Sequence, residues 1–315
     1  MYFYDYNHRP RHLYMYFTAV NACKFLEKHN IKFSKPTLFN DPFECHVDFN
    51  RSLVTSGFSK SYENGKLNER DTEGLQDSVN SQLSKRKIAC FSEENDSVLM
   101  WAYYAEGQRG ICIEFDTEKD PLFFSQMKKV KYKSELPTIN SLHSQAYEDI
   151  ITTKCKKWEH EKEWRVIKDD LYGCFFPINP QAITSVIFGC SSVNWEYNKN
   201  ENCVYEQIFK NLQRPEYSHI KLKCMLLVQE EYRLKCLEMP FFVIQETSHT
   251  LMIYSLNNSL LNILKITEDG SYKDVIYKSV MNKWGKTEIT LPNGNYYIGD
   301  DQTKCGIRIL VKDDE

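Results

Sequence analysis

The sequence predicts an α+β fold in two domains that meet near residue 239. Residues 1–239 alternate short strand-like runs with a few helical stretches and lack a regular strand–helix–strand repeat, which favours mixed short-strand sheets with flanking helices. From residue 240 onward, seven short strand-like runs are separated by turn residues at the interval typical of a β-sandwich. We therefore expect an α+β domain at 1–239 and an all-β, sandwich-like domain at 240–315.

The composition limits the kinds of function. Of the 315 residues, 42% are hydrophobic, which suffices for the cores of two medium-sized domains. The formal net charge of −3 gives no bulk electrostatic support for nucleic-acid binding. The eleven cysteines include no Cys-x-x-Cys pair, so we expect reduced thiols and no metal site. Without a signal-peptide pattern or an apolar run near the ~18 residues that span a bilayer, we expect a cytoplasmic protein with no membrane partner.

Local patterns predict the first elements of the α+β domain. The aromatic run Leu13–Phe17 indicates a strand, and Thr18 can cap a helix over residues 19–28. Ile31–Ser34 alternates like a second strand. A turn is expected at Asn40-Asp41-Pro42, because Asx–Pro pairs favour turn geometry.

The rest of the chain is predicted in the same way. Residues 51–85 are polar with weak helical periodicity and indicate a helix or an irregular excursion. Further helices are expected at Ser97–Ala105, 140–160 and 202–212, and strands at Lys87–Ser92, Gly110–Phe115, Val130–Tyr132, Trp164–Ile167, Ser185–Gly189 and in a hairpin over 220–238. The seven strands of the C-terminal domain are expected at Phe241–Gln245, His249–Tyr254, Leu260–Thr267, Tyr272–Lys278, Lys286–Leu291, Tyr296–Gly299 and Gly306–Val311.

Two polar or aromatic clusters are candidates for function. Asn40-Asp41-Pro42-Phe43-Glu44 is either a structural turn capped by its own Asx side chains or a loop whose carboxylates line a pocket. Trp101 and Tyr104 are three residues apart, so they share one helical face. That face either packs in the core or offers an aromatic platform to a planar ligand, with Ser92 at a strand end as a hydrogen-bond donor.

The third cluster is Glu161-Lys162-Glu163-Trp164-Arg165. In a strand, alternation would place Glu161, Glu163 and Arg165 on one face. The paired carboxylates would raise each other's pKa, and the guanidinium would lower it again. The group is either a surface salt-bridge ladder or a site in which a carboxylate stabilises a developing sugar cation, as in glycoside cleavage.

Taken in order, these motifs resemble a widespread bacterial family of uncharacterised domains, over about residues 12–235. The residues that carry the resemblance are Leu13–Tyr16, Phe33–Glu44 with its Phe-Asn-Asp-Pro-Phe-Glu motif, Cys90–Ala105 with Met-Trp-x-x-Tyr-Ala, Gly110–Phe115, and Glu161–Arg165 with Glu-x-Glu-Trp-Arg. The last 75 or so residues lie outside it.

More distantly, the layout is similar to small ADP-ribosyltransferases, including those that modify DNA. This resemblance implies NAD as a substrate and Glu163 as the catalytic carboxylate, assisted by Glu161 and oriented by Arg165. The residues that it implies for binding NAD are Tyr16, Ser34, Asn40, Asp41, Ser92, Trp101 and Tyr104.

The resulting hypothesis is an NAD-dependent ADP-ribosyltransferase or NAD-cleaving effector, acting as a bacterial toxin or in antiviral defence on a nucleic-acid or protein acceptor. Two alternatives stay open. One is a non-catalytic module that binds a nucleotide or a partner, and the other is a metal-dependent nuclease using Asp41, Glu44, Glu161 and Glu163. The C-terminal domain is expected to bind a partner or to self-associate, since Phe241–Gln245 and Tyr272–Lys278 would offer edge strands.

Overall fold

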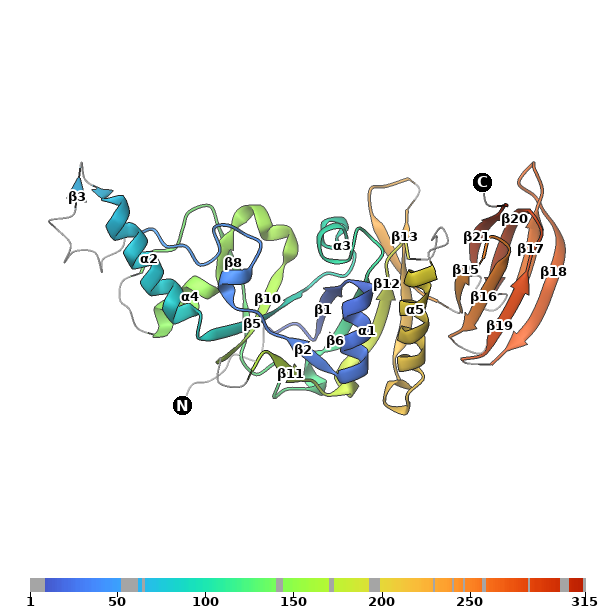
Figure 1. The fold of residues 1–315 in the computed structure, drawn as a ribbon, viewed down its shortest axis with the longest axis horizontal. Helices are drawn as coiled ribbons and strands as arrows, with labels where there is room; N and C mark the ends of the chain where they lie inside the picture. The colour runs from blue at the N-terminus through green and yellow to red at the C-terminus, as the bar shows by residue number, and fades with distance from the viewer. Residues whose placement is uncertain are drawn as a thin grey trace. The chain divides into compact units, whose positions relative to one another are not determined.

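The computed structural model describes residues 9–51, 62–63, 66–139, 144–169, 173–192, 199–228, 230–239, 241–245, 247–256, 259–282, 284–300 and 306–313. They form a mixed α+β structure with several sheets and few helices, as the α+β part of the prediction states (Figure 1). Pro240, at the predicted domain boundary, lies outside the described residues.

Two compact units make up the chain, and each is assembled from separate stretches. The first unit comprises Met1–Met15, His29–Glu94 and Asp116–Ala182, and the second comprises Tyr16–Lys28, Asn95–Phe115 and Ile183–Glu315. Each unit therefore depends on pairing between segments that are distant in the sequence.

The first unit is built on antiparallel strands. Its elements are the start of β1 (His12–Phe17), β2 (Asn30–Lys32), η2 (Pro36–Leu38), β3 (Tyr62–Glu63), β4 (Lys66–Leu67), α2 (Glu69–Leu83), β5 (Arg86–Ser92), η4 (Thr117–Lys119), β7 (Met127–Lys129), β8 (Lys131–Lys133), α4 (Ser144–Ile151), β9 (Thr153–Cys155), η5 (Lys156–Glu161), β10 (Glu163–Asp169), β11 (Phe175–Pro177) and η7 (Pro180–Ala182). Strands β1, β5, β10 and β7 are neighbours in that order. Strand β10 pairs with β5 over its whole length, with Glu163 opposite Ser92 and Arg165 opposite Cys90.

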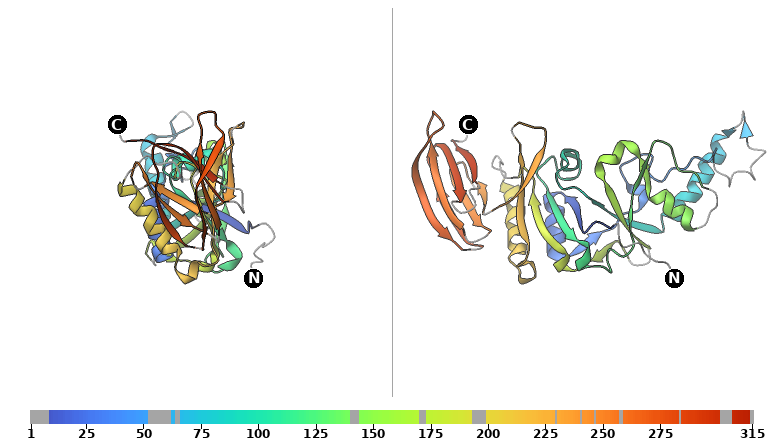
Figure 2. Two further views of the ribbon diagram at one scale, coloured as in Figure 1. Left: turned by 90° about the vertical axis from the view of Figure 1, so that its right-hand side faces the viewer. Right: turned by 180° about the vertical axis from the view of Figure 1, so that it is seen from behind.

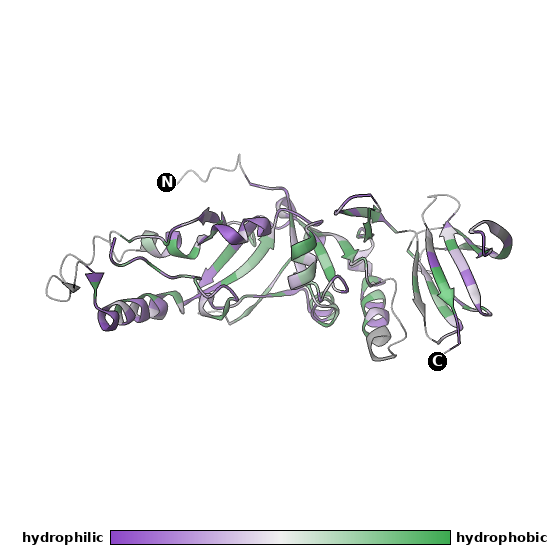
Figure 3. Cartoon of the chain, turned by 90° about the horizontal axis from the view of Figure 1, so that it is seen from above, coloured by the Kyte–Doolittle hydropathy of each residue, from purple (hydrophilic) through white to green (hydrophobic). Residues whose placement is uncertain are grey.

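Helices α2 and α4 cover one face of the β5–β10 pair. Val79 and Leu83 of α2, Ile88 of β5, Ile151 of α4 and Ile167 of β10 belong to one buried core cluster. Most of the rest of α2 is hydrophilic (Figure 3), and Val79 and Leu83 are the residues by which it enters the core. Its first turn is capped by Asn68, whose side chain accepts a hydrogen bond from the Asp71 amide.

Side chains along strands β5 and β10 point alternately to the two faces of the sheet. Residues two apart in a strand point the same way, so Arg165 projects on the same side as Ile167, toward α4. On the opposite side, Phe91 packs against the rings of Phe123 and Phe124, with centroids 6.4 and 5.4 Å away. Glu163 and Arg165 of the third cluster are therefore on the side of the sheet that the helices cover.

The second unit contains two groups of strands. The first group has the order β14-β13-β12-β6, and its elements are α1 (Ala19–Lys28), α3 (Val98–Tyr104), β6 (Ile111–Asp116), β12 (Ile183–Phe188), α5 (Lys199–Leu212), η8 (Pro215–Tyr217), β13 (Lys221–Leu227) and β14 (Leu234–Glu238). Strands β13 and β14 form the hairpin expected over 220–238. The Tyr217 hydroxyl donates to the Leu26 carbonyl at 2.7 Å and ties η8 to α1.

The second group of strands follows residue 240. Its strands are β15 (Phe241–Gln245), β16 (Thr250–Ser255), β17 (Ser259–Ile266), β18 (Tyr272–Met281), β19 (Lys286–Thr290), β20 (Gly294–Asp300) and β21 (Gly306–Val311), so each of the seven expected strands is present. They form two antiparallel sheets, β15-β16-β19 and β18-β17-β20-β21 (Figure 2). Both sheets contribute to one hydrophobic core, with Leu251 and Ile253 from the first and Ile263 and Ile298 from the second.

One expected element differs clearly from the structure. Residues 140–160 were expected to be helical, but helix α4 ends at Ile151, Thr153–Cys155 forms strand β9 and Lys156–Glu161 forms the 3-10 helix η5. Residues 140–143 lie outside the described part. Among the described residues, no helix is long and apolar enough to cross a membrane.

Gly189 has no room for a side chain. A Cβ at this position would lie 2.0 Å from the carbonyl oxygen of Gln108, far inside contact distance. We expect Gly189→Ala to lower the free energy of unfolding by about 1–3 kcal/mol. Gly74→Ala is the matched control, because a Cβ on this helical glycine meets nothing within 4 Å, and it should stabilise by about 0.5–1 kcal/mol. Urea denaturation followed by circular dichroism measures the free energy of unfolding of both variants. Equal changes in the two variants would contradict the close approach of Gln108 to Gly189.

Candidate functional site

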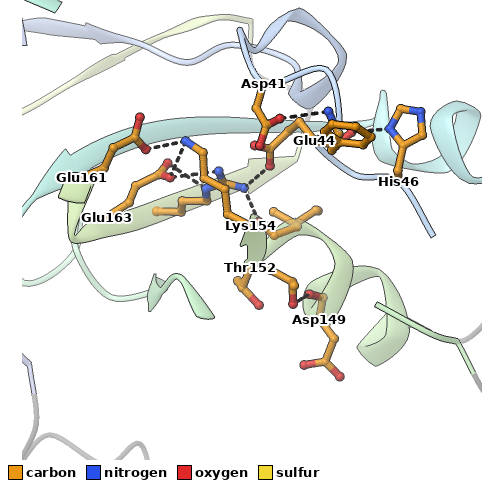
Figure 4. A network of polar contacts seen from close by, with 12 residues as sticks. Asp41, Glu44, His46, Asp149, Thr152, Lys154, Glu161 and Glu163 are labelled. Carbon is orange, nitrogen blue, oxygen red and sulfur yellow. Dashed lines mark hydrogen bonds and ion pairs between the residues drawn. The ribbon is translucent and has the colours of Figure 1, made fainter. Parts of the chain in front are cut away.

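A buried ion-pair network in the first unit is the strongest candidate site. Its members are Glu44, Lys154, Glu161, Glu163 and Arg165, and we call it the Arg165 network (Figure 4). Their side chains are at most 5% exposed. The alternative of a surface salt-bridge ladder is therefore wrong.

Arg165 joins three segments of the chain. Its Nε and Nη2 atoms donate to Oε1 and Oε2 of Glu163 at 2.8 and 3.0 Å, which makes a two-pronged ion pair within strand β10. Its Nη1 atom donates to Glu44 Oε1 at 2.6 Å and also to the carbonyl oxygen of Ile151, at the end of helix α4. The guanidinium thus links β10, the loop after η2 and α4.

Lys154 completes the network from strand β9. Its Nζ donates to Oε2 of Glu161 and, at 3.2 Å, to Oε2 of Glu163. The backbone amide of Glu163 donates to the Tyr132 hydroxyl at 2.8 Å, and the Ser92 hydroxyl donates to the carbonyl of Glu161 at 2.7 Å. Side chain and main chain of this segment are therefore both fixed.

The local chain path explains how the two glutamates meet one lysine. Glu161 is the last residue of η5, and Lys162 takes a left-handed conformation with φ 43° before β10 begins at Glu163. Glu161 therefore precedes the strand, and simple strand alternation does not place it. The turn at Lys162 brings the Glu161 carboxylate to Lys154 instead.

Burial and charge act in opposite directions on the two glutamates that contact Arg165. Burial alone would raise the pKa of Glu163, but Arg165 and Lys154 outweigh it and lower this pKa to about 2. For Glu44, burial prevails over its single guanidinium contact, and the pKa is raised above its ordinary value. The two carboxyl groups on one guanidinium therefore have pKa values shifted in opposite directions, lowered for Glu163 by the two cations and raised for Glu44 by burial.

Two carboxylate oxygens near the network lack a hydrogen-bond partner among the described residues. They are Oε2 of Glu44 and Oδ2 of Asp41, and both are buried. The other oxygen of Asp41 accepts from the Phe43 amide at 2.9 Å, and the Glu44 amide donates to the Asp41 carbonyl at 3.0 Å. The expected turn at Asn40–Glu44 is therefore present, and it also delivers a carboxylate into the network.

A pocket of about 170 Å³ adjoins the network at Lys154. Its other lining residues are Phe43, His46, Lys133, Ser134, Glu135, Leu136, Pro137, Thr153 and Cys155. Phe43 is 60% exposed, and its ring lies edge-on to that of His46 at 6.4 Å. A small ligand in this pocket would lie against the loop that carries Glu44.

The remaining candidate residues are divided between the two units. In the first unit, Ser34 forms a backbone bridge to Ile88, Asn40 is exposed, and Ser92 is buried. The second unit contains three aromatic candidates, Tyr16, Trp101 and Tyr104.

The aromatic candidates differ in accessibility. Trp101 is fully buried, its Nε1 donates to the Asn95 carbonyl at 2.6 Å, and Tyr16 packs edge-on to its ring at 5.3 Å. Tyr104 is partly exposed, and its ring lies 6.5 Å from that of Tyr103. These positions favour core packing for Trp101 and leave Tyr104 the more accessible ring.

Sequence reasoning missed Lys154 and Tyr132. Lys154 was assigned to a helix, and nothing in its neighbours distinguishes it from the adjacent lysines; only the parallel pairing of β8 with β9 places it beside the glutamates. No group of three or more His, Cys, Asp or Glu side chains in the described part of the chain is placed to hold a metal ion. In the Arg165 network, the cations of Lys154 and Arg165 lie between the carboxylates.

Comparison with known proteins gives one match. Residues 100–166 match a family model described as Protein of unknown function (DUF2971). This supports the predicted resemblance to an uncharacterised domain family. The matched stretch contains Trp101–Tyr104 and Glu161–Arg165, whereas Asn40–Glu44 lies outside it. No match was found among curated proteins or solved structures.

The substitution Arg165→Met tests how much the Arg165 network contributes to the stability of the fold. It would leave Glu44 and Glu163 buried without their main counter-charge, and we expect a loss of about 3–5 kcal/mol in the free energy of unfolding. Lys221→Met is the control, because the Lys221–Glu238 pair is exposed and should contribute little. Denaturant titration compares the two variants. Similar effects would show that burial does not govern these ion pairs.

The pKa of Glu163 predicts how stability depends on pH. Because this pKa is lower in the folded state, the ionised group stabilises the fold above about pH 4.5, and that contribution is lost as the pH falls toward 2. Glu163→Gln should therefore flatten the acid limb of stability against pH, by up to about 1.4 kcal/mol per pH unit. Glu44→Gln should not flatten it, since the pKa of Glu44 is raised. The free energy of unfolding, measured from pH 7 to pH 2.5, distinguishes these outcomes. If Glu163→Gln leaves the slope of stability against pH unchanged, the lowered pKa of Glu163 is refuted.

Proposed function

We propose that the first unit carries a site that cleaves the N-glycosidic bond of NAD and transfers or hydrolyses the ADP-ribosyl group. The observation that carries this proposal is a pair of buried carboxyl groups on one guanidinium, of which Glu163 has both oxygens paired and Glu44 keeps Oε2 without a partner among the described residues. Burial raises the pKa of Glu44, whereas the two cations lower the pKa of Glu163. Pairs of carboxyl groups whose environments push their pKa values apart are typical of sites that need one ionised and one proton-exchanging carboxyl group.

The chemistry would use each carboxyl group differently. When the bond between ribose C1′ and nicotinamide breaks, its electron pair leaves with nicotinamide and positive charge develops on the sugar. The ionised Glu163, with Glu161 beside it, would stabilise this charge, and Arg165 would orient the carboxylates. Water or an acceptor nucleophile would then attack C1′ and release a proton, which Glu44 could take through its unpartnered Oε2.

The wider setting of this activity belongs to the same proposal. The likeness in layout to small ADP-ribosyltransferases supports a nucleic-acid or protein acceptor and a role as a toxin or antiviral effector. The cysteine pattern of the sequence supports a cytoplasmic location. The shared core of the two C-terminal sheets supports a sandwich-like accessory domain. Ser34, Asn40, Asp41 and Ser92, the candidates that lie in the first unit, stay proposed NAD contacts.

A non-catalytic binding module is the second candidate, and burial of the network favours it. Both oxygens of Glu163 already accept hydrogen bonds, and the residue is 4% exposed. A nucleotide or partner group would then occupy the pocket beside Lys154 while the Arg165 network stays intact.

Nicotinamide release separates the two candidates. Purified protein is incubated with labelled NAD, with and without nucleic acid and cell lysate, beside Glu163→Gln and Glu44→Gln. We expect release by the unmodified chain and a loss of at least about 100-fold in both variants. Glu159→Gln, an exposed glutamate of η5, is the matched control and should keep full activity.

Thermal melting of each variant accompanies the assay, so that lost activity can be distinguished from lost fold. Turnover that survives Glu163→Gln and Glu44→Gln in folded protein would refute the assigned roles. Absence of turnover under every condition, together with saturable NAD binding that Phe43→Ala weakens, would favour the binding module.

A further inference from the structure

Strand β18 is an unusual sheet edge. It runs for 10 residues, Tyr272–Met281, and is the longest strand in the described part of the chain. It is the end strand of its four-stranded sheet and pairs with β17 alone among the described strands. Natural edge strands are usually short or interrupted by charges and proline, because the unpaired backbone groups of an edge invite another strand.

Strand β18 exposes several apolar side chains beside the charged Asp274 and Lys278. Val275, Ile276 and Val280 are 58%, 43% and 76% exposed, and Tyr272 is 49% exposed. By contrast, the edge strand β19 has 5 residues and exposes Lys and Glu side chains. Exposed apolar groups collected on one strand mark an interaction surface.

The register of β18 on β17 explains part of this exposure. Ile263 is opposite Tyr277, Leu264 is opposite Val275 and Ile266 is opposite Tyr272, so β18 has an extra residue at Ile276 and a second one between Tyr272 and Val275. A bulge lets two consecutive side chains project toward the same side, which accounts for the exposure of both Val275 and Ile276. Bulges often protect an edge, but Val275 and Ile276 stay exposed on β18.

The sequence of β18 is complementary to itself. If two copies of the strand run antiparallel with Ile276 opposite Ile276, then Asp274 of each copy faces Lys278 of the other. In the same register, Tyr272 faces Val280. The pair of opposite charges and the pair of apolar groups therefore each occur twice, as a two-fold symmetric contact requires.

We propose that β18 is a homodimer interface, in which the strand pairs antiparallel with β18 of a second copy about a two-fold axis at Ile276. A shift by two residues on either copy would separate Asp274 from Lys278, so their charges favour this register over such a shift. The apolar side chains are removed from water in the same contact. This interface does not depend on the proposed NAD chemistry, which concerns the first unit.

Charge reversal tests the interface on the full-length chain. Sedimentation velocity over a range of concentrations should show a monomer–dimer equilibrium. Asp274→Lys should raise the dimer dissociation constant about tenfold or more, because it turns two attractive cross-strand pairs into two repulsive ones. Lys278→Asp should act alike, and the double swap Asp274→Lys with Lys278→Asp should restore the dimer.

Glu288→Lys on β19 makes the same change of charge on another exposed edge and should leave the dimer unaffected. Oxidation adds a test of register, since Ile276→Cys should form an intermolecular disulfide and Tyr272→Cys alone should not. A monomeric chain at about 100 µM, a dimer that Asp274→Lys leaves intact, or a double swap that fails to restore association in folded protein would overturn the proposal.

Discussion

The first unit depends on burying one guanidinium. Arg165 is fully buried, so each of its donors must find an acceptor inside the protein. It finds them on three segments, at Glu163, at Glu44 and at the carbonyl of Ile151. Replacing such a pair by apolar groups is often neutral, so its value lies less in net stability than in the single arrangement that satisfies it.

Charge balance in the network follows from the same burial. Three carboxylates, Glu44, Glu161 and Glu163, share the two cations Lys154 and Arg165. Glu163 contacts both cations and is held ionised, whereas Glu44 contacts only the guanidinium and keeps one oxygen without a partner. Glu44 is thus the network carboxylate that keeps a buried oxygen without a hydrogen bond to any described residue. Glu44 lies between Phe43 and His46, which line the pocket.

The sequence predicted what local patterns determine. The seven C-terminal strands were predicted within a few residues, because turn residues such as Gly270, with φ 82°, separate them. The motif Glu-x-Glu-Trp-Arg identified three network members. Glu44 is 121 residues from Arg165, and only the folded loop brings them together. Lys154 lies in a strand too short for any periodicity to indicate, so its place between two glutamates was not predictable.

Burial of Glu163 also limits what the Glu-x-Glu-Trp-Arg motif can contact. A glutamate that must contact a ribose needs an accessible oxygen, and both oxygens of Glu163 are already paired. Glu44 has the only unpartnered carboxylate oxygen among the described members of the Arg165 network, but that oxygen is buried as well. The proposed catalysis would therefore require a carboxylate oxygen of the Arg165 network to become exposed when a substrate enters, whereas binding in the pocket alone would not. The two proposed functions thus differ in whether the buried carboxylates become accessible.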